Sequence, residues 1–276
     1  MAYKNTRREF IKDTTTMAAL WGAGDLGAHA VPSSVPSALF KTFQNPPREF
    51  TVVPFWFIND DLDENELIRQ MDDFIAHGVY GLVPHARIGL PEDIGWMSDH
   101  WLHYMKVVVD HAAKRDMTII LYDEGMYPSG SCHGQVVAAN PEHATRSIER
   151  IRKQDLKGDE NVVFEDKKYA YVHGYSGGHI RGVHFGTDDG EPGAPPSADI
   201  LNPEAVASFL HLTHDKHYEV LGEHFGKTIR SIFTDEPDTM GRGKRRGTME
   251  WTPGFEDYLE DYLGYDFIPC LPALWS

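Results

Sequence analysis

Apolar and polar residues alternate along this chain in blocks that predict strands followed by helices. Four apolar runs of strand length lie at 50–58, 80–83, 117–122 and 229–233. Segments downstream of these runs carry apolar residues at the three- and four-residue spacing of one helix face. A repeated strand-helix order of this kind predicts an α/β fold built on a parallel sheet.

Local signals predict where the helices begin. Asp63 followed by Glu66 has the spacing of a capping box, and Ser98 is a suitable N-cap for the second helix. Asn202-Pro203 combines an N-cap with a first-turn proline, so it predicts the start of the third helix. A last helix is predicted to open at Thr252-Pro253.

The segment 142–198 breaks this pattern. Its short apolar stretches lie among Gly, Asp, Lys and Pro, which predicts a β-rich insertion of antiparallel strands after strand three. The parallel strands end in polar or charged residues, and no glycine-rich nucleotide-binding motif opens a helix. We therefore expect the N-terminal half of a (β/α)8 TIM barrel. A whole barrel takes about 250 residues, and the chain ends after its fourth unit, so we expect it to be truncated.

Residues 1–30 are predicted to be a twin-arginine signal peptide. The stretch 6–12 has the twin-arginine pattern, an apolar stretch follows, and 28–30 fits a cleavage site. A basic cytosolic tail is the alternative, which Asp25 inside the apolar stretch favours. With export, the protein is expected in the periplasm or secreted. Residues 31–47, rich in Pro and Ser, are then a linker, and 48–276 form the partial barrel domain.

Composition limits the partners that this chain can have. The chain has 276 residues, of which 41% are hydrophobic and 25% charged, as is typical of a globular protein. Its net charge of -16 argues against nucleic acid and against an anionic membrane surface. No apolar run approaches the roughly 18 residues that cross a bilayer. Cys132 and Cys270 are either one disulfide or two free thiols.

Two strands are followed by an acidic pair, and these pairs are the main candidates for chemistry. Asp123-Glu124 follows the third strand and Asp235-Glu236 follows the fourth. Cleavage of a glycosidic bond needs one carboxyl group as proton donor and one carboxylate as base or nucleophile. We expect Glu236 and Glu124 to be catalytic and Asp123 and Asp235 to contact substrate. The alternative is that these acids cap turns or pair with nearby basic side chains.

A second set of polar residues follows the first two strands. Asn59, Asp60, His85 and Arg87 lie where the strands end, and Asn, His and Arg there suit hydrogen bonding to sugar hydroxyls. Nearby aromatic side chains, among them Trp56, are candidates for stacking on a sugar ring. We therefore expect Asn59, His85, Arg87 and Trp56 to bind substrate.

Metal and charge motifs are weaker signals. His211, His214 and His217 share helical spacing, which a solvated helix face explains better than zinc does. An oxygen-ligated calcium ion at the strand-end acids is the better metal hypothesis, and no organic cofactor is expected. The basic run 241–246 is either a solvated loop or a contact for an acidic sugar such as a uronate. Replacing Arg245 and Arg246 and comparing activity on neutral and acidic substrates tests the second alternative.

Together these motifs resemble glycoside hydrolase family 106, the α-L-rhamnosidases. The resemblance rests on the motifs at 54–60, 85–90, 121–124 with 128–130, and 233–237. It implies a (β/α)8 catalytic domain followed by β-sandwich domains, release of a terminal deoxysugar with inversion, and a calcium ion near the active site. The site residues that it implies are Asn59, His85, Arg87, Glu124 and Glu236.

The resulting hypothesis is a secreted, rhamnosidase-like glycoside hydrolase that acts on plant or microbial polysaccharide. One alternative is a catalytically inactive module that binds carbohydrate or assembles by self-association, because half-barrels leave sheet edges uncovered. Another is a barrel hydrolase of a different kind that depends on a metal ion.

Overall fold

The computed structural model describes residues 37–87, 89–91, 93–125, 127–181 and 193–275, and the predicted signal peptide lies outside them. The chain divides into two compact units, residues 1–47 and 48–276. In the first unit, helix α2 (Ser37–Gln44) occupies part of the segment predicted to be a linker. That prediction did not foresee a helix, although the apolar residues between its prolines permit one.

Four parallel strands form one sheet of the second unit. The strands are β1 (Phe55–Ile58), β2 (Gly81–Ala86), β3 (Thr118–Tyr122) and β7 (Ile229–Phe233), and they lie side by side in the order β1-β2-β3-β7. All three pairings are parallel. The four predicted strands therefore exist and lie beside one another in sequence order.

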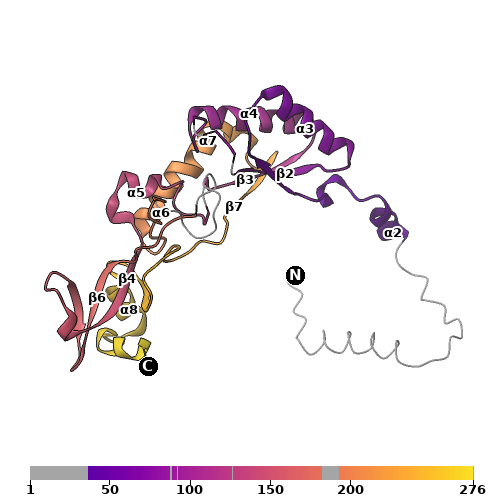
Figure 1. The fold of residues 1–276 in the computed structure, drawn as a ribbon. Helices are drawn as coiled ribbons and strands as arrows, with labels where there is room; N and C mark the ends of the chain where they lie inside the picture. Colours follow the sequence, from indigo (N-terminus) through magenta and orange to yellow (C-terminus); the bar gives the residue numbers. More distant parts are fainter. Residues whose placement is uncertain (1–36, 88, 92, 126, 182–192, 276) are drawn as a thin grey trace, which may run out of the picture. The chain divides into compact units, whose positions relative to one another are not determined.

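Helices connect these strands and cover one side of the sheet. They are α3 (Glu64–Ala76), α4 (Asp99–Lys114), α6 (Pro203–Leu210) and α7 (Lys216–Leu221). Figure 1 shows α3, α4 and α7 together on the same side of the strands. A π-helical turn, η4 (His211–Asp215), joins α6 to α7, so the third predicted helix is one long but irregular element.

Side-chain caps begin α3, α4 and α6 as predicted. At α6, Asn202 accepts a hydrogen bond from the Glu204 amide at 2.9 Å. Asp63 accepts a hydrogen bond from the Glu66 amide at 3.0 Å, which satisfies a donor that has no partner within the helix. Ser98 accepts from the amide of Trp101 at 3.2 Å at the start of α4. These three helix starts are confirmed because capping is a local interaction that the sequence alone specifies. The last helix, α8 (Phe255–Leu263), begins after Gly254 without a side-chain cap instead of at the predicted Thr252-Pro253.

Strand alternation gives the parallel sheet two different faces. Trp56 and Ile58 belong to the core shared with the helices. Their neighbours Phe55 and Phe57 point to the opposite face, where they are 43% and 47% exposed. Tyr122 lies within 6.1 Å of the Phe55 ring centroid on that face, so an aromatic layer lines it.

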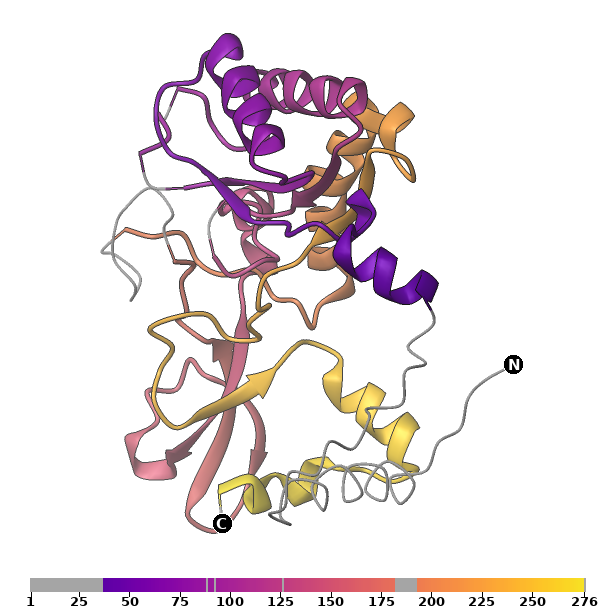
Figure 2. The same ribbon diagram turned by 90° about the vertical axis from the view of Figure 1, so that its right-hand side faces the viewer.

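A second, antiparallel sheet contains the predicted β-rich insertion. It consists of β4 (Arg146–Arg152), β5 (Asn161–Glu165), β6 (Tyr169–Tyr175) and β8 (Thr248–Trp251), in the order β5-β6-β4-β8. Figure 2 shows β8, drawn in yellow, beside the rose-coloured strands. β8 was not predicted, because its four residues are ordered by pairing with the distant β4 rather than by a local pattern. The protein is thus a mixed α/β fold.

The remaining elements are short. They are η1 (Arg48–Phe50), α5 (Gln135–Ala139), η2 (Pro141–His143), η3 (Lys153–Asp155), η5 (Gly222–His224), α8 (Phe255–Leu263) and η6 (Ile268–Trp275). Cys132 is buried, Cys270 is exposed, and both are free thiols. Among the residues described, no helix combines the length and the apolar character needed to span a membrane.

Candidate functional site

The carboxyl ends of β3 and β7 are joined by a hydrogen-bond network. The Tyr122 phenol donates to Asp235 Oδ2 at 2.7 Å. The Ser129 hydroxyl donates to Asp123 Oδ1 at 2.5 Å and accepts from the Asp235 amide at 2.9 Å. The two acidic strand ends therefore lie at one edge of one sheet, as their positions after parallel strands predict.

Asp123 lies on the helix-covered side of this network. It is fully buried, and its Oδ2 accepts from the Thr234 hydroxyl at 2.6 Å. The His214 Nε2 lies 3.4 Å from the same oxygen. Both oxygens of Asp123 are thus engaged by protein groups, so this residue holds the strand ends together.

Glu124 is also fully buried, and backbone amides surround its carboxylate. Oε1 accepts from the amides of Gly125 at 2.9 Å and His133 at 2.5 Å. Oε2 accepts from Ser131 at 2.9 Å and Cys132 at 2.8 Å. Successive amides turned toward one anion form a backbone nest, which is typical of a carboxylate that organises a loop. Glu124 was expected to be catalytic, but its carboxylate is instead enclosed by the backbone amides of Gly125 and residues 131–133.

Glu236 is exposed and lies at a cleft. The cleft has a volume of about 600 Å³. Its lining includes polar and charged side chains, namely those of Tyr127, Glu236, Asp238, Arg242 and Lys244. The Tyr127 phenol donates a hydrogen bond to Glu236 Oε2. Burial and this bond raise the pKa of Tyr127 to about 12, so the phenol remains a donor near neutral pH. Of the two acidic pairs that follow β3 and β7, Glu236 is thus the exposed member.

The backbone of Glu236 is unusual. Its φ of 38° lies in the left-handed region, which costs a non-glycine residue energy. Such conformations persist where the surrounding structure holds them, and they occur most often at functional sites. The next residue, Pro237, lines both this cleft and a second hollow of about 240 Å³. That second hollow borders Asp123 but is lined largely by apolar side chains, which suits a sugar poorly.

The other predicted substrate residues lie elsewhere along the sheet edge. Asn59, Asp60 and Arg87 are exposed beyond the ends of β1 and β2, and none of them is among the residues that line the cleft. The Arg87 guanidinium lies 4.9 Å from the Phe57 ring centroid, a cation-π contact on the open face of the sheet. They are close to the strand ends, as expected, but the structure does not bring them to Glu236.

The prediction that Trp56 stacks on a sugar was wrong. Its side chain is buried among the helices, where its indole nitrogen donates to Gln70 at 2.9 Å. Strand alternation explains the error, since Phe55 and Phe57 take the open face and leave Trp56 to the core.

His85 lies beneath the aromatic layer instead of at the rim. It is 3% exposed, and its ring centroid is 3.7 Å from that of Tyr122. In the described part of the chain neither ring nitrogen of His85 has a hydrogen-bond partner. Burial, reinforced by the positive charge of Arg87, lowers the pKa of His85 to about 4. The imidazole is therefore neutral near pH 7.

Acid is expected to destabilise the protein through His85 and His217. Burial is the main cause that lowers the pKa of each to about 4 from 6.5. The unfolded chain then binds more protons than the folded one, so the free energy of unfolding falls as pH drops from about 6.5 toward 4. Urea unfolding at a series of pH values measures this slope. His85→Phe is expected to reduce it, and an unchanged slope would contradict the assignment.

The three helical histidines do not share a solvated face. His211 is exposed, but His214 points to Asp123 and His217 is 1% exposed. The π-helical turn η4 changes the residue spacing through this segment, and the α-helical spacing used for prediction did not include it. The prediction of a solvated face was therefore wrong for His214 and His217.

Asp123 and Glu124 fit a calcium ion poorly. Both oxygens of Asp123 and both oxygens of Glu124 already accept hydrogen bonds from the protein. A calcium ion would have to displace those donors, since its ligands are free oxygen atoms.

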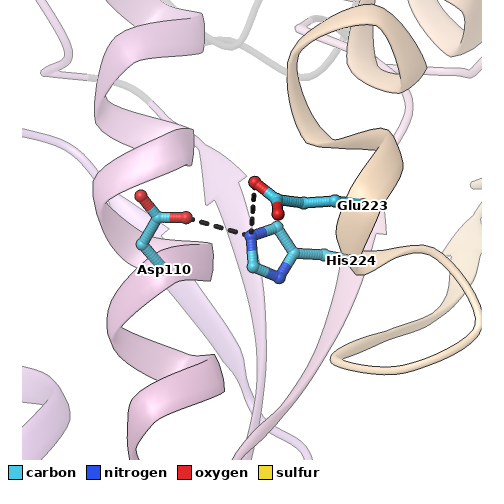
Figure 3. A group of neighbouring side chains, drawn as sticks. All are labelled: Asp110, Glu223 and His224. Atoms are coloured by element: carbon cyan, nitrogen blue, oxygen red, sulfur yellow. Dashed lines mark hydrogen bonds and ion pairs between the residues drawn. The ribbon is translucent and has the colours of Figure 1, made fainter.

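A different carboxylate-histidine group lies among the helices. Ligand atoms of Asp110, Glu223 and His224 lie within 4.8 Å of one another, and Figure 3 shows the imidazole directed at both carboxylates. The Lys106 ammonium is 2.9 Å from Asp110 Oδ2 and 3.9 Å from Glu223. A protein cation therefore already pairs with both carboxylates. We interpret it as an ion-pair cluster that joins α4 to η5.

Two residues of this site were not predicted from the sequence. Ser129 belongs to the motif at 128–130, but its position between the two strand ends depends on how the loop folds back. Asp238 lines the cleft because of the turn after Glu236, which no pattern indicated, whereas Arg242 belongs to the basic run 241–246. A search for polar residues within about ten positions of each strand end would have included Ser129 and Asp238.

Comparison with known proteins identifies no relative. No family model matches the chain, and neither the curated proteins nor the solved structures contain a significant match.

Proposed function

We propose that this chain is a glycoside hydrolase that cleaves its substrate in the cleft beside Glu236. The observation that carries the proposal is the contrast between the strand-end acids. Asp123 and Glu124 are buried and bound by protein donors, whereas Glu236 lines a cleft of sugar-binding size. An accessible carboxyl group at the carboxyl end of a parallel strand is where barrel enzymes carry out chemistry.

The residues around Glu236 have distinct roles in this proposal. Glu236 transfers a proton to or from the glycosidic oxygen or a water molecule. Tyr127 orients its carboxyl group by donating a hydrogen bond. Asp238 lines the same cleft and supplies the second carboxylate that cleavage requires. Glu124 acts indirectly, because its bonds to the loop amides position the segment that precedes the cleft.

The fold supports the same proposal at a coarser level. Strands in sequence order, with α3, α4 and α7 on one side, suit the N-terminal half of a (β/α)8 barrel better than a doubly wound sheet. Combined with the motif resemblance, this favours a rhamnosidase-like enzyme that is exported and acts on plant or microbial polysaccharide.

Hydrolysis assays on the 276-residue chain test the proposal. Release of reducing sugar is measured with a panel of polysaccharides and with aryl glycosides that include an α-L-rhamnoside, with and without a strong chelator. Turnover that survives the chelator is expected. Absence of turnover on every glycoside would contradict the proposal.

A carbohydrate-binding module is the second candidate, and one observation favours it. Asp238 Oδ1 already accepts from the amides of Met240 and Gly241 at 2.9 and 3.1 Å, so Asp238 also has a structural role. Binding needs no second carboxylate. Saturable sugar binding without any turnover would favour this candidate over the hydrolase.

A further inference from the structure

The basic run 241–246 divides into two parts in the structure. Arg242 and Lys244 line the cleft that contains Glu236. Arg245 turns toward the antiparallel sheet, where it lies 3.4 Å from Glu149 and donates to the Tyr175 carbonyl. Of the two alternatives for this run, a solvated loop or a contact for an acidic sugar, Arg245 agrees with the loop, because it binds the antiparallel sheet.

Among the residues that the structure describes, the half-buried Arg242 side chain forms no hydrogen bond or ion pair, although its positive charge acts on the Tyr127 phenol. Lys244 likewise has no ion pair within that part of the chain. Acidic residues outnumber basic ones by 42 to 26, so counter-charges are abundant in this protein. The guanidinium of Arg242 therefore has donors available to a negatively charged ligand in the cleft.

The loop that carries Arg242 is held in place by the protein itself. Arg242 and His179 exchange two backbone hydrogen bonds of 2.8 Å each, and the Ser176 hydroxyl donates to the Met240 carbonyl at 2.9 Å. A Cβ at Gly178 would lie 1.7 Å from that carbonyl oxygen, so the loop packs directly on this glycine. The position of Arg242 is therefore set before a ligand arrives, which lowers the entropic cost of binding.

We propose that the cleft selects acidic saccharides, with the sugar carboxylate bound by Arg242 and Lys244 while Glu236 faces the glycosidic oxygen. The proposal rests on the function proposed above, since it names the substrate class of the same cleft. A guanidinium presents a planar pair of donors that matches a carboxylate, and Lys244 adds a second positive charge. Uronic acids are the sugars that carry such a group on the ring.

Binding to a galacturonate trimer and to its methyl ester tests the proposal, because esterification removes the charge and retains the sugar. Dissociation constants are measured by calorimetry for the 276-residue chain at low and high salt. The acid form is expected to bind roughly tenfold or more tightly than the ester at low salt, as for charge-assisted hydrogen bonds. The preference should weaken as salt screens the charges.

Three variants separate the outcomes. Arg242→Gln with Lys244→Gln is expected to abolish the preference for the acid, whereas Arg246→Gln, at an exposed position outside the cleft lining, should retain it. Equal affinity for both trimers, or a preference that survives the double substitution, would overturn the acidic substrate class alone. Binding of neither trimer would also overturn it. Glu236→Gln should retain the preference while hydrolysis is lost, and turnover of neutral glycosides only would leave the hydrolase proposal standing.

Discussion

Replacing Glu236 by glutamine is expected to slow glycoside hydrolysis by about 10²–10⁴-fold, the usual contribution of a general acid or base. Glutamine keeps the shape of the side chain and can still accept a hydrogen bond from Tyr127, but its amide cannot donate or take up a proton near neutral pH. The free energy of unfolding should change little, because Glu236 is exposed and its carboxylate accepts a hydrogen bond from a single phenol, that of Tyr127, among the described residues. Initial rates on the best panel substrate and urea unfolding measure the two effects.

Two further variants control this experiment. Glu219→Gln alters an exposed acid on α7 and should leave the rate unchanged. Tyr127→Phe removes the hydrogen bond to Glu236 and should give a smaller loss, about tenfold. A Glu236→Gln rate within twofold of the unmodified chain would remove Glu236 from the mechanism.

Replacing Glu124 by glutamine is expected to destabilise the fold by about 3–5 kcal/mol, the cost of leaving buried charged or polar partners without their counterpart. The amide nitrogen of glutamine would direct its own N–H groups at backbone amides that now donate to Oε1 or Oε2. Cys132 and His133 also adopt φ of 48° and 55°, which the carboxylate helps to hold. Urea unfolding measures the loss.

The control for this second experiment is again Glu219→Gln, which should change the free energy of unfolding by no more than about 0.5 kcal/mol. If Glu124→Gln were as stable as that control and lost hydrolysis instead, Glu124 would be catalytic, as the sequence pattern indicates. Equal stability with full activity would contradict both roles.

Local features of the chain could be predicted well from sequence. The four parallel strands were predicted because each is a short apolar run, and the caps at Asp63 and Ser98 because capping needs only residues three apart. The adjacency of the acidic strand ends followed from parallel pairing, which puts all carboxyl ends at one edge. These inferences depend on neighbours in sequence or on a general rule of sheet geometry.

Whether an individual side chain is buried or exposed depends on contacts between distant residues, which no local sequence pattern contains. Glu124 and Glu236 occupy the same place after their strands, yet a loop with left-handed residues encloses the first and leaves the second exposed. Trp56 belongs to the core because of the strand register, and β8 exists because β4 lies beside it. Such differences arise from backbone conformations and pairings across the chain.

Covalent labelling by a sugar-directed electrophile tests the role of Glu236 most directly. Epoxypropyl glycosides of rhamnose and of galacturonate carry an epoxide that a nearby carboxylate opens, forming an ester that mass spectrometry locates. We predict one adduct, on Glu236, and protection when the corresponding free saccharide is in excess. Labelling of Glu219 and other exposed carboxylates as readily as Glu236, without protection by saccharide, would contradict a sugar-cleaving site at this cleft.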